Sequence, residues 1–288
     1  MNIPKIVRQI KKDVRVFGPH ILKVGVGWMI GSSAVKTRLR GSGDVTIRPM
    51  DSDLETFRQV YTQKQYEVPT LDQRQRLDRY YDQLLEHETV PLIIDAGANI
   101  GAAALWFSDR YPKSQIVAIE PDAQSAALCR CNTASRPNVT VVEGAIGGSP
   151  GNVAVAGADK SWAVTTQRTK VQSGGLKVHT VHDLQGLIQG RKALFLVKVD
   201  IEGFEADLFE HSVEWVAEAA AIFVEVHDWL FPNKHTSQSM QKALLGQGFE
   251  ILLRGENLMF IREASELDRM AASSKHARSG LEAHARPA

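Results

Sequence analysis

The feature that most constrains the fold is an alternation that begins at Val90, where short apolar runs are separated by longer segments with helical spacing. Three runs read as strands, at residues 92–95, 116–120 and 139–143, with helical segments at 102–110 and 123–134 between them. Strands that alternate with helices of about 10–15 residues form βαβ units around a parallel sheet. Two further runs, 194–199 and 221–226, are almost wholly apolar, as central strands covered on both faces are. The pattern predicts a doubly wound α/β domain.

The 288-residue chain divides on this pattern into four segments. We expect a basic amphipathic arm at 1–43, a helical lead-in or cap at 44–86, the α/β domain at 87–263 and a flexible tail at 264–288. Arg40-Gly-Ser-Gly-Asp44 resembles a linker, and Ser52-Asp53-Leu54-Glu55 fits a capping box at a helix start. The tail has few large apolar side chains, which favours disorder.

The first 40 residues carry nine cations and one acid, a net charge of +8, whereas the whole chain is at +1. An apolar stripe runs along the same segment, formed by Ile3, Val7, Ile10, Val14 and Phe17. Three interpretations stay open: a helix packed on its own protein or a dimer mate, a helix on an anionic membrane surface, or a flexible arm. The near-neutral total gives no case for nucleic-acid binding, and no apolar run approaches the ~18 residues of a membrane span. We therefore expect a cytoplasmic protein with peripheral membrane contact through residues 1–40 as an option.

A strand-to-helix turn lies at residues 93–101, which read Ile-Ile-Asp-Ala-Gly-Ala-Asn-Ile-Gly. Ligands of open parallel sheets bind beyond such turns. Gly97 would let a ligand approach the backbone, Asn99 tolerates unusual backbone angles, and Gly101 would open the helix with free N–H groups. The turn is neither G-x-G-x-x-G nor a P-loop, so it is not built for a pyrophosphate. A carboxylate at Asp95 suits an amino group or a cation better than a phosphate.

The next two strand ends carry weaker signals. Glu120, in Ile-Glu-Pro, stands 25 positions after Asp95 at a strand tip, where an acid accepts hydrogen bonds from ribose hydroxyls. Its simpler interpretation is an acid at a helix start. Glu143 and Ala145, in Glu-Gly-Ala-Ile-Gly, could form one wall of an adenine slot, although a plain turn explains them nearly as well.

The densest group of carboxylates follows the strand at 194–199, in the sequence Val-Lys-Val-Asp-Ile-Glu-Gly-Phe-Glu. The helix macrodipole is enough to explain Glu205 but explains Asp200, at the strand tip, less well. On the next strand, Glu225 and His227 share a face because side chains alternate. His227 should then lie beside Asp200, where it is a candidate general base.

Taken together, these motifs resemble the FkbM family of S-adenosylmethionine-dependent methyltransferases. The matching pieces are IIDAGANIG, AIEPD, EGAIG, VKVDIEGFE and FVEVH, in that order, with IRPMDSDLETFRQVY upstream, so the resemblance covers residues 44–262. It implies a class I methyltransferase (Rossmann-like) fold with a seven-stranded, mostly parallel sheet whose last strand is antiparallel. It also implies O-methylation of a hydroxyl on a sugar, glycan or secondary metabolite.

The resemblance also implies roles for the marked residues. The turn from Asp95 to Gly101 would face the methionine part of S-adenosylmethionine, Glu120 would hold the ribose, and residues 143–145 would lie near the adenine. Asp200 would face the methyl-transfer site. A hydroxyl is a poor nucleophile, so Asp200 and His227 are candidate bases. We assign no metal, although Asp200, Glu225 and His227 could instead hold a divalent ion.

Two rival functions share parts of this pattern. A nicotinamide-dependent oxidoreductase would have the same βαβ opening and ribose acid, but the glycine fingerprint is missing. A non-catalytic module would bind the cofactor without turnover, which the intact acids at 200, 202 and 205 disfavour. The acceptor and the oligomeric state, including a homo-oligomer, are left open. Specificity for the acceptor should depend on residues 44–86 and 157–176.

Overall fold

The computed structural model describes residues 3–156, 165–168 and 175–284. Its centre is a seven-stranded sheet in the order β12-β13-β11-β10-β3-β4-β5. The strands are β3 (Val90–Ala96), β4 (Gln115–Glu120), β5 (Val139–Glu143), β10 (Lys192–Val199), β11 (Ala221–Glu225), β12 (Phe249–Arg254) and β13 (Asn257–Arg262). The neighbours from β5 to β11 pair in parallel, and β13 is antiparallel to both β11 and β12. This confirms the predicted sheet, including its antiparallel last strand.

Helices cover both faces of this sheet, because alternate strand residues point to opposite sides. On one face Ile93, Ile116 and Phe223 pack with α4 (Leu71–Glu86), α5 (Ala102–Arg110) and α6 (Ala123–Thr133). On the other face Ile94, Val117 and Val224 pack under α7 (Val181–Gly186), α8 (Glu205–Leu208), α9 (Trp215–Glu218) and α10 (Gln238–Leu244). The central strands are therefore buried on both sides, and the fold is doubly wound.

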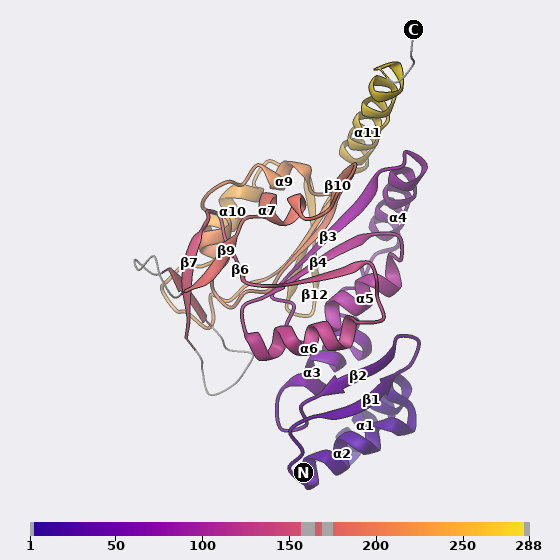
Figure 1. Cartoon of the computed structure of the whole chain (residues 1–288), viewed down its shortest axis with the longest axis vertical. Helices are drawn as coiled ribbons and strands as arrows, with labels where there is room; N and C mark the ends of the chain where they lie inside the picture. The colour runs from indigo at the N-terminus through magenta and orange to yellow at the C-terminus, as the bar shows by residue number, and fades with distance from the viewer. Residues whose placement is uncertain (1–2, 157–164, 169–174, 285–288) are drawn as a thin grey trace.

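The N-terminal segment packs beside this sheet domain, at the lower end of Figure 1. It contains α1 (Ile3–Phe17), η1 (Gly18–His20), α2 (Ile21–Met29), β1 (Val35–Leu39), β2 (Gly43–Ile47), α3 (Asp53–Phe57) and η2 (Arg58–Thr62). Phe17 is fully buried and meets the ring of Phe57 edge-on, while Arg58 forms an ion pair of 2.6 Å with Asp13. Of the predicted apolar stripe, Phe17 packs on the protein itself, whereas Ile10 and Val14 are 53% and 38% exposed, so packing on its own protein is seen only at this end of α1.

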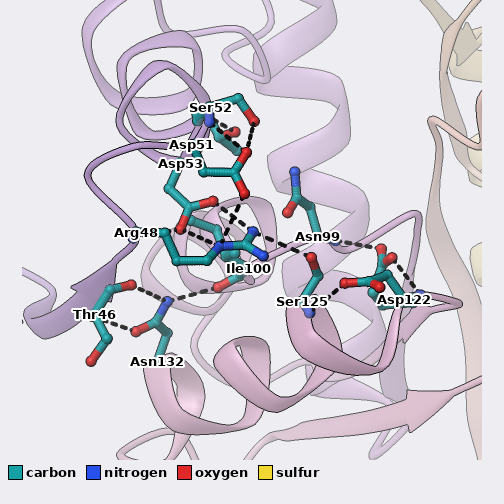
Figure 2. Close-up of polar contacts among 12 residues, drawn as sticks. Thr46, Arg48, Asp51, Ser52, Asp53, Asn99, Ile100, Asp122, Ser125 and Asn132 are labelled. Atoms are coloured by element: carbon teal, nitrogen blue, oxygen red, sulfur yellow. Dashed lines mark hydrogen bonds and ion pairs between the residues drawn. The ribbon is translucent and has the colours of Figure 1, made fainter. Parts of the chain in front are cut away.

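Two local predictions for this segment are wrong. The glycine-rich stretch read as a linker is the turn of an antiparallel hairpin, in which β1 pairs with β2. Ser52 precedes α3, but its side chain makes no capping hydrogen bond. Asp53 has the larger role, because it is fully buried and holds Arg48 at 2.7 Å. Figure 2 shows Arg48 reaching from Asp53 to Ser125, at the start of α6.

A second contact ties the same hairpin to the sheet domain. The Asn132 side chain accepts a hydrogen bond from the Thr46 amide and donates to the carbonyl oxygens of Thr46 and Ile100 (Figure 2). These bonds connect β2, α6 and the turn after β3. The lead-in is therefore anchored directly behind the ligand edge of the sheet.

A small four-stranded sheet lies at the side of the domain, in the order β6-β9-β7-β8 (Figure 1). Its strands are β6 (Ala145–Ile146), β7 (Gly151–Ala156), β8 (Thr165–Arg168) and β9 (Leu176–His179). Most of the predicted specificity segment 157–176 lies outside the described residues.

The prediction of a flexible C-terminal tail is wrong for the described residues, which form α11 (Ala264–His284). Leu267 and Ala271 are buried in the cluster that holds Leu77 and Tyr80 of α4. The spacing of four residues places both side chains on one face of the helix, and this short stripe docks it. None of the helices in the described part of the chain is long and apolar enough to span a bilayer.

Candidate functional site

The carboxyl ends of β3, β10 and β11 border a cleft of about 320 Å³. Its floor includes Asn99 from the turn after β3 and Asp200 from the end of β10. Gln65 and Tyr66, which follow η2, also line the cleft. The volume is within the range of small-ligand pockets, and the position is the one expected for a doubly wound sheet.

The turn after β3 has the unusual backbone that its sequence predicts. Gly97, Asn99 and Gly101 have φ angles of +75°, +48° and +86°. The reason for glycine differs from the predicted one, however. A Cβ on Gly97 would lie 1.7 Å from the carbonyl oxygen of Asp200, and one on Gly101 would lie 2.9 Å from the sulfur of Cys129. Both glycines allow close packing within the protein, and the Gly101 amide is occupied by a hydrogen bond to Ala98.

Asp95 meets a cation supplied by the chain itself. Its carboxylate is fully buried, and Lys198 Nζ lies 3.2 Å from Oδ1. The same ammonium donates to the carbonyl oxygens of Ala96 and Gly97 and lies 3.5 Å from Asp200. Burial disfavours the charged amine, but the carboxylates outweigh this effect and raise the pKa of Lys198. Lys198 therefore holds the β3 turn and the end of β10 together, and Asp95 belongs to this support.

Glu120 ends β4 and is at the strand tip beside the turn, as predicted, but it is 6% exposed and lies behind Asn99 instead of lining the cleft itself. Its carboxylate accepts hydrogen bonds from the backbone amides of Asn99 at 2.8 Å and Asp122 at 2.9 Å. Burial raises its pKa to about 7, against the lowering effect of these two amides. The side-chain oxygen of Asn99 is buried and has no hydrogen-bond partner among the described residues.

The third strand end is less like the prediction. Glu143 is exposed and forms an ion pair of 3.1 Å with Arg130. Ala145 is buried in the small cluster formed by Val153, Val178 and Phe204. Neither residue lines the cleft described above. Their proposed contact with the adenine stays a prediction.

Asp200, Glu225 and His227 come together as the alternation predicts. His227 is 2% exposed, and its Nε2 lies 3.7 Å from Asp200 Oδ1 and 3.8 Å from Glu225 Oε1. Two carboxylates left out of the predicted site complete the group, which we call the strand-end cluster. Glu202 Oε2 lies 3.6 Å from the same Nε2, and Glu205 Oε1 lies 2.7 Å from Nδ1.

The strand-end cluster shifts the ionisation of its members. Burial opposes charge on His227, but the hydrogen bond to Glu205 and the nearby Asp200 and Glu202 outweigh it and raise the pKa to about 9. Burial, followed by repulsion from Asp200, raises the pKa of Glu202 to about 7 and that of Glu225 to about 8. In this arrangement the imidazole is protonated at neutral pH. It therefore balances the carboxylates, and the arrangement does not by itself support the predicted base role of His227.

Several site residues were missed because their partners are distant in sequence. Glu205 looks like a helix-start acid, and only the fold brings it to His227. Lys198 appears in the sequence as one polar residue within an apolar strand, which was the available signal for a buried charge. Gln65, from the lead-in, donates to Glu225 at 3.3 Å, and Trp229 stands 67% exposed at the cleft.

Comparison with known proteins gives a family and a relative. Residues 95–251 match the methyltransferase FkbM domain. The chain is also 26% identical over 155 residues to the 2-O-methyltransferase NoeI of Sinorhizobium fredii. That match covers 48% of this chain and 64% of the relative, which is less than two thirds of its length.

Similar solved structures are distant from this chain. The precorrin-6y C5,15-methyltransferase of Geobacter metallireducens is 12% identical, with a TM-score of 0.35 over 66% of this chain and 89% of that one. A putative caffeoyl-CoA O-methyltransferase from Staphylococcus aureus is 13% identical, with a TM-score of 0.34 over 74% and 94%. Aeropyrum pernix fibrillarin, in a complex with natively bound S-adenosyl-L-methionine, is 13% identical, with a TM-score of 0.34 over 63% and 74%.

Proposed function

Because the chain belongs to the FkbM methyltransferase domain family, we propose that it transfers a methyl group from S-adenosylmethionine to a hydroxyl oxygen. The observation that carries this proposal is the meeting of two elements at one cleft. The positive-φ turn at Gly97–Gly101 lies directly against the backbone of Asp200, which leads into the strand-end cluster. A cofactor turn and a group of carboxylates are thus side by side, as a transfer to a hydroxyl requires.

The described residues fit S-adenosylmethionine. Glu120 is the carboxylate that would accept the ribose hydroxyls, and the unpartnered side-chain oxygen of Asn99 would take a donor from the amino-acid part. Asp95 is too deeply buried for direct contact, so its role is to hold Lys198 and the turn. When bound, the cofactor supplies a methyl group already activated on a sulfonium.

The chain then has to position the acceptor and remove one proton. Asp200 and Glu225 line the cleft on neighbouring strands and retain 27% and 15% side-chain exposure. An acceptor hydroxyl in this cleft lies within reach of both carboxylates, and one of them takes the proton as the oxygen is methylated. His227, fixed by Glu205, keeps these acids in place. Correct alignment of the oxygen with the reacting bond supplies much of the acceleration.

Other side chains that line the cleft support one acceptor class. Trp229 presents an exposed indole, while Gln65 and Glu55 add polar groups. An apolar face with hydrogen-bonding groups around it suits a sugar ring, which has both C–H and O–H surfaces. The named relative is a 2-O-methyltransferase. We therefore favour a sugar or glycan hydroxyl over a phenolic secondary metabolite.

The proposal is tested by calorimetry and by mass spectrometry. S-Adenosylhomocysteine should bind with a micromolar Kd, roughly −8 kcal/mol. Screening hydroxylated glycans and polyketides with S-adenosylmethionine should give a product heavier by one methylene. Tighter binding of NAD would favour the oxidoreductase, and cofactor binding without turnover on any acceptor would favour the non-catalytic module.

We also propose that the protein works at an anionic membrane surface. The inner face of α2 packs closely, since a Cβ on Gly27 would lie 2.3 Å from Val35. The outer face, which we call the α2 apolar face, is formed by Leu22, Val26, Met29 and Ile30, all between 49% and 73% exposed. Positive charge is supplied on α2 by Lys23 and on the preceding helix α1 by the exposed side chains of Lys11, Lys12 and Arg15.

Apolar and cationic groups together suit an anionic bilayer, whereas a dimer mate would need only the apolar ones. Co-sedimentation with vesicles should increase with the anionic lipid fraction and decrease with salt. A concentration-dependent dimer that the same salt does not affect would instead identify a second copy as the occupant. The cytoplasmic location stays a prediction.

A further inference from the structure

We propose that the strand-end cluster binds one divalent cation of the Mg²⁺ or Mn²⁺ class, with Asp200, Glu202 and His227 as ligands. This inference rests on the proposed function, because it gives the cation a role at the methyl-transfer site. One ligand atom from each of the three residues lies within 4.8 Å of the other two.

The strongest observation concerns His227, whose ring is almost fully buried yet has a nitrogen with no hydrogen bond. Nδ1 is held by Glu205 at 2.7 Å, and Glu205 is itself 1% exposed. Nε2 lies 3.6–3.8 Å from one oxygen each of Asp200, Glu202 and Glu225, beyond hydrogen-bond distance, and an ion bound there would take the place of its proton. Metal-binding histidines typically have one nitrogen oriented by a carboxylate and the other free for the ion.

The oxygens are placed for a small ion. Ligands about 2.1 Å from a cation are separated by roughly 3 Å when adjacent and 4 Å when opposite, so the observed spread needs only small rotamer changes. Glu202 is brought here by a turn with φ of +52°, and Gly203 follows with φ of +92° under the ring of Phe231. Glu225 stands beside the group, and the charge of a bound cation would favour its ionised form, which a proton acceptor needs although burial raises its pKa to about 8 in the protein alone.

The donor set defines the class of cation. The two carboxylate oxygens favour Mg²⁺ and Mn²⁺, the imidazole nitrogen favours Mn²⁺ of these two, and the group contains no thiolate to favour a softer ion. A cation bound to the acceptor oxygen lowers the pKa of the hydroxyl. The O–H bond then breaks and the proton passes to Glu225. The oxygen forms its bond to the methyl carbon as the C–S bond breaks, and the electron pair stays on sulfur, which leaves a neutral thioether.

The experiment measures cation and cofactor binding separately on the full chain. After dialysis against EDTA, we expect Mn²⁺ to bind at one site per chain, observed by electron paramagnetic resonance, with a micromolar Kd. Asp200→Asn and Glu202→Gln should each weaken Mn²⁺ binding at least tenfold. Glu205→Gln, which acts through His227, should weaken it by roughly 10–100-fold. Glu214→Gln, an exposed acid that does not line the cleft, is the matched control and should bind as wild type.

The outcomes separate this inference from the proposed function. The cation site is overturned if the folded full chain, checked by its thermal unfolding, binds S-adenosylhomocysteine but not Mn²⁺. That outcome leaves the proposed methyltransferase function intact. Mn²⁺ binding without S-adenosylhomocysteine binding overturns the proposed methyltransferase function and leaves the cation site intact. Undiminished Mn²⁺ binding in both the Asp200 and the Glu202 variants also overturns the inference, because the ion would then be held elsewhere.

Discussion

The strand-end cluster and the α2 apolar face are opposite in chemistry, yet each is unfavourable in the protein alone. The cluster gathers four carboxylates around His227, three of them less than one quarter exposed at the side chain. The α2 apolar face leaves Met29 and Ile30 70% and 73% exposed to water. Buried charge and exposed apolar surface both lower stability. Their difference teaches that the two proposed ligands must differ: a small polar one would relieve the cluster, and a broad apolar one would cover the α2 apolar face.

The largest expected effect is a loss of turnover in variants of the strand-end cluster. Asp200→Asn should reduce turnover by roughly 10²–10⁴-fold, the range for lost help with a proton, while cofactor affinity stays within a few-fold. His227→Ala should do the same if the chain folds. Turnover with a competent acceptor and cofactor calorimetry are the two measurements. Full activity in the Asp200 variant would place the chemistry outside the strand-end cluster.

The next effect tests whether cofactor binding is independent of that cluster. Glu120→Ala should weaken S-adenosylhomocysteine binding by about 1.5–3 kcal/mol, because hydrogen bonds to a charged acceptor are lost. In the bound complex its turnover number should fall far less than that of the Asp200 variant. The affinity is checked by calorimetry, with Glu214→Gln as the control. An unchanged Kd would contradict the assignment of Glu120 to the ribose.

A smaller effect should appear as pH dependence. Burial raises the pKa of Glu120 to about 7, so the carboxylate that we assign to the ribose hydroxyls becomes protonated as pH falls through 7. Affinity should then decrease about tenfold per pH unit below 7. Folding stability should respond in the opposite direction, decreasing as pH rises from 4.5 to about 7, since the unfolded acid ionises more readily. Glu120→Gln should remove the trend in affinity and reduce the trend in stability, to which Glu202 and Glu225 also contribute because their pKa values are raised to about 7 and about 8.

The smallest expected effect is a loss of vesicle binding in a variant of the α2 apolar face. Ile30→Ser should reduce partition onto anionic vesicles by about five- to tenfold, since one large side chain contributes ~1–1.5 kcal/mol when partly buried. Leu245→Ser is the matched control, because Leu245 is 83% exposed and lies outside the α2 apolar face. Co-sedimentation provides the measurement, and cofactor affinity should be the same in both variants. Equal losses of vesicle binding in the two variants would mean that any exposed apolar side chain binds vesicles nonspecifically, and would contradict a contact through the α2 apolar face.

The sequence predicts the sheet domain well because its signals are local. Alternating runs define the strands, and the order of Asp95, Glu120, Asp200 and Glu225 follows from strands that end at one edge. The C-terminal helix was missed because its docking stripe is short, with Leu267 and Ala271 as its buried members. The hairpin at 35–47 was missed because glycines in a turn look like glycines in a linker.

Within the site, the sequence predicts residues at strand tips but not their partners. His227 was correctly placed beside Asp200, since both follow neighbouring strands. Its bond to Glu205 joins residues 22 positions apart, with α8, α9 and β11 in the intervening segment, and no periodicity relates them. Likewise, Gly97 looks like a ligand-facing glycine, and only the fold shows that the backbone of Asp200 occupies the space beside it.

That last contact links the two halves of the reaction. Because the Gly97 turn and Asp200 touch through their backbones and share Lys198, neither can move without the other. Binding at one is then coupled to binding at the other, and such coupling is reciprocal. An acceptor that tightens S-adenosylhomocysteine binding by some factor must itself be bound tighter by that same factor. If both ligands bind as proposed, the protein would favour the ternary complex over either binary one, and titrations of each ligand in the presence of the other measure how strongly.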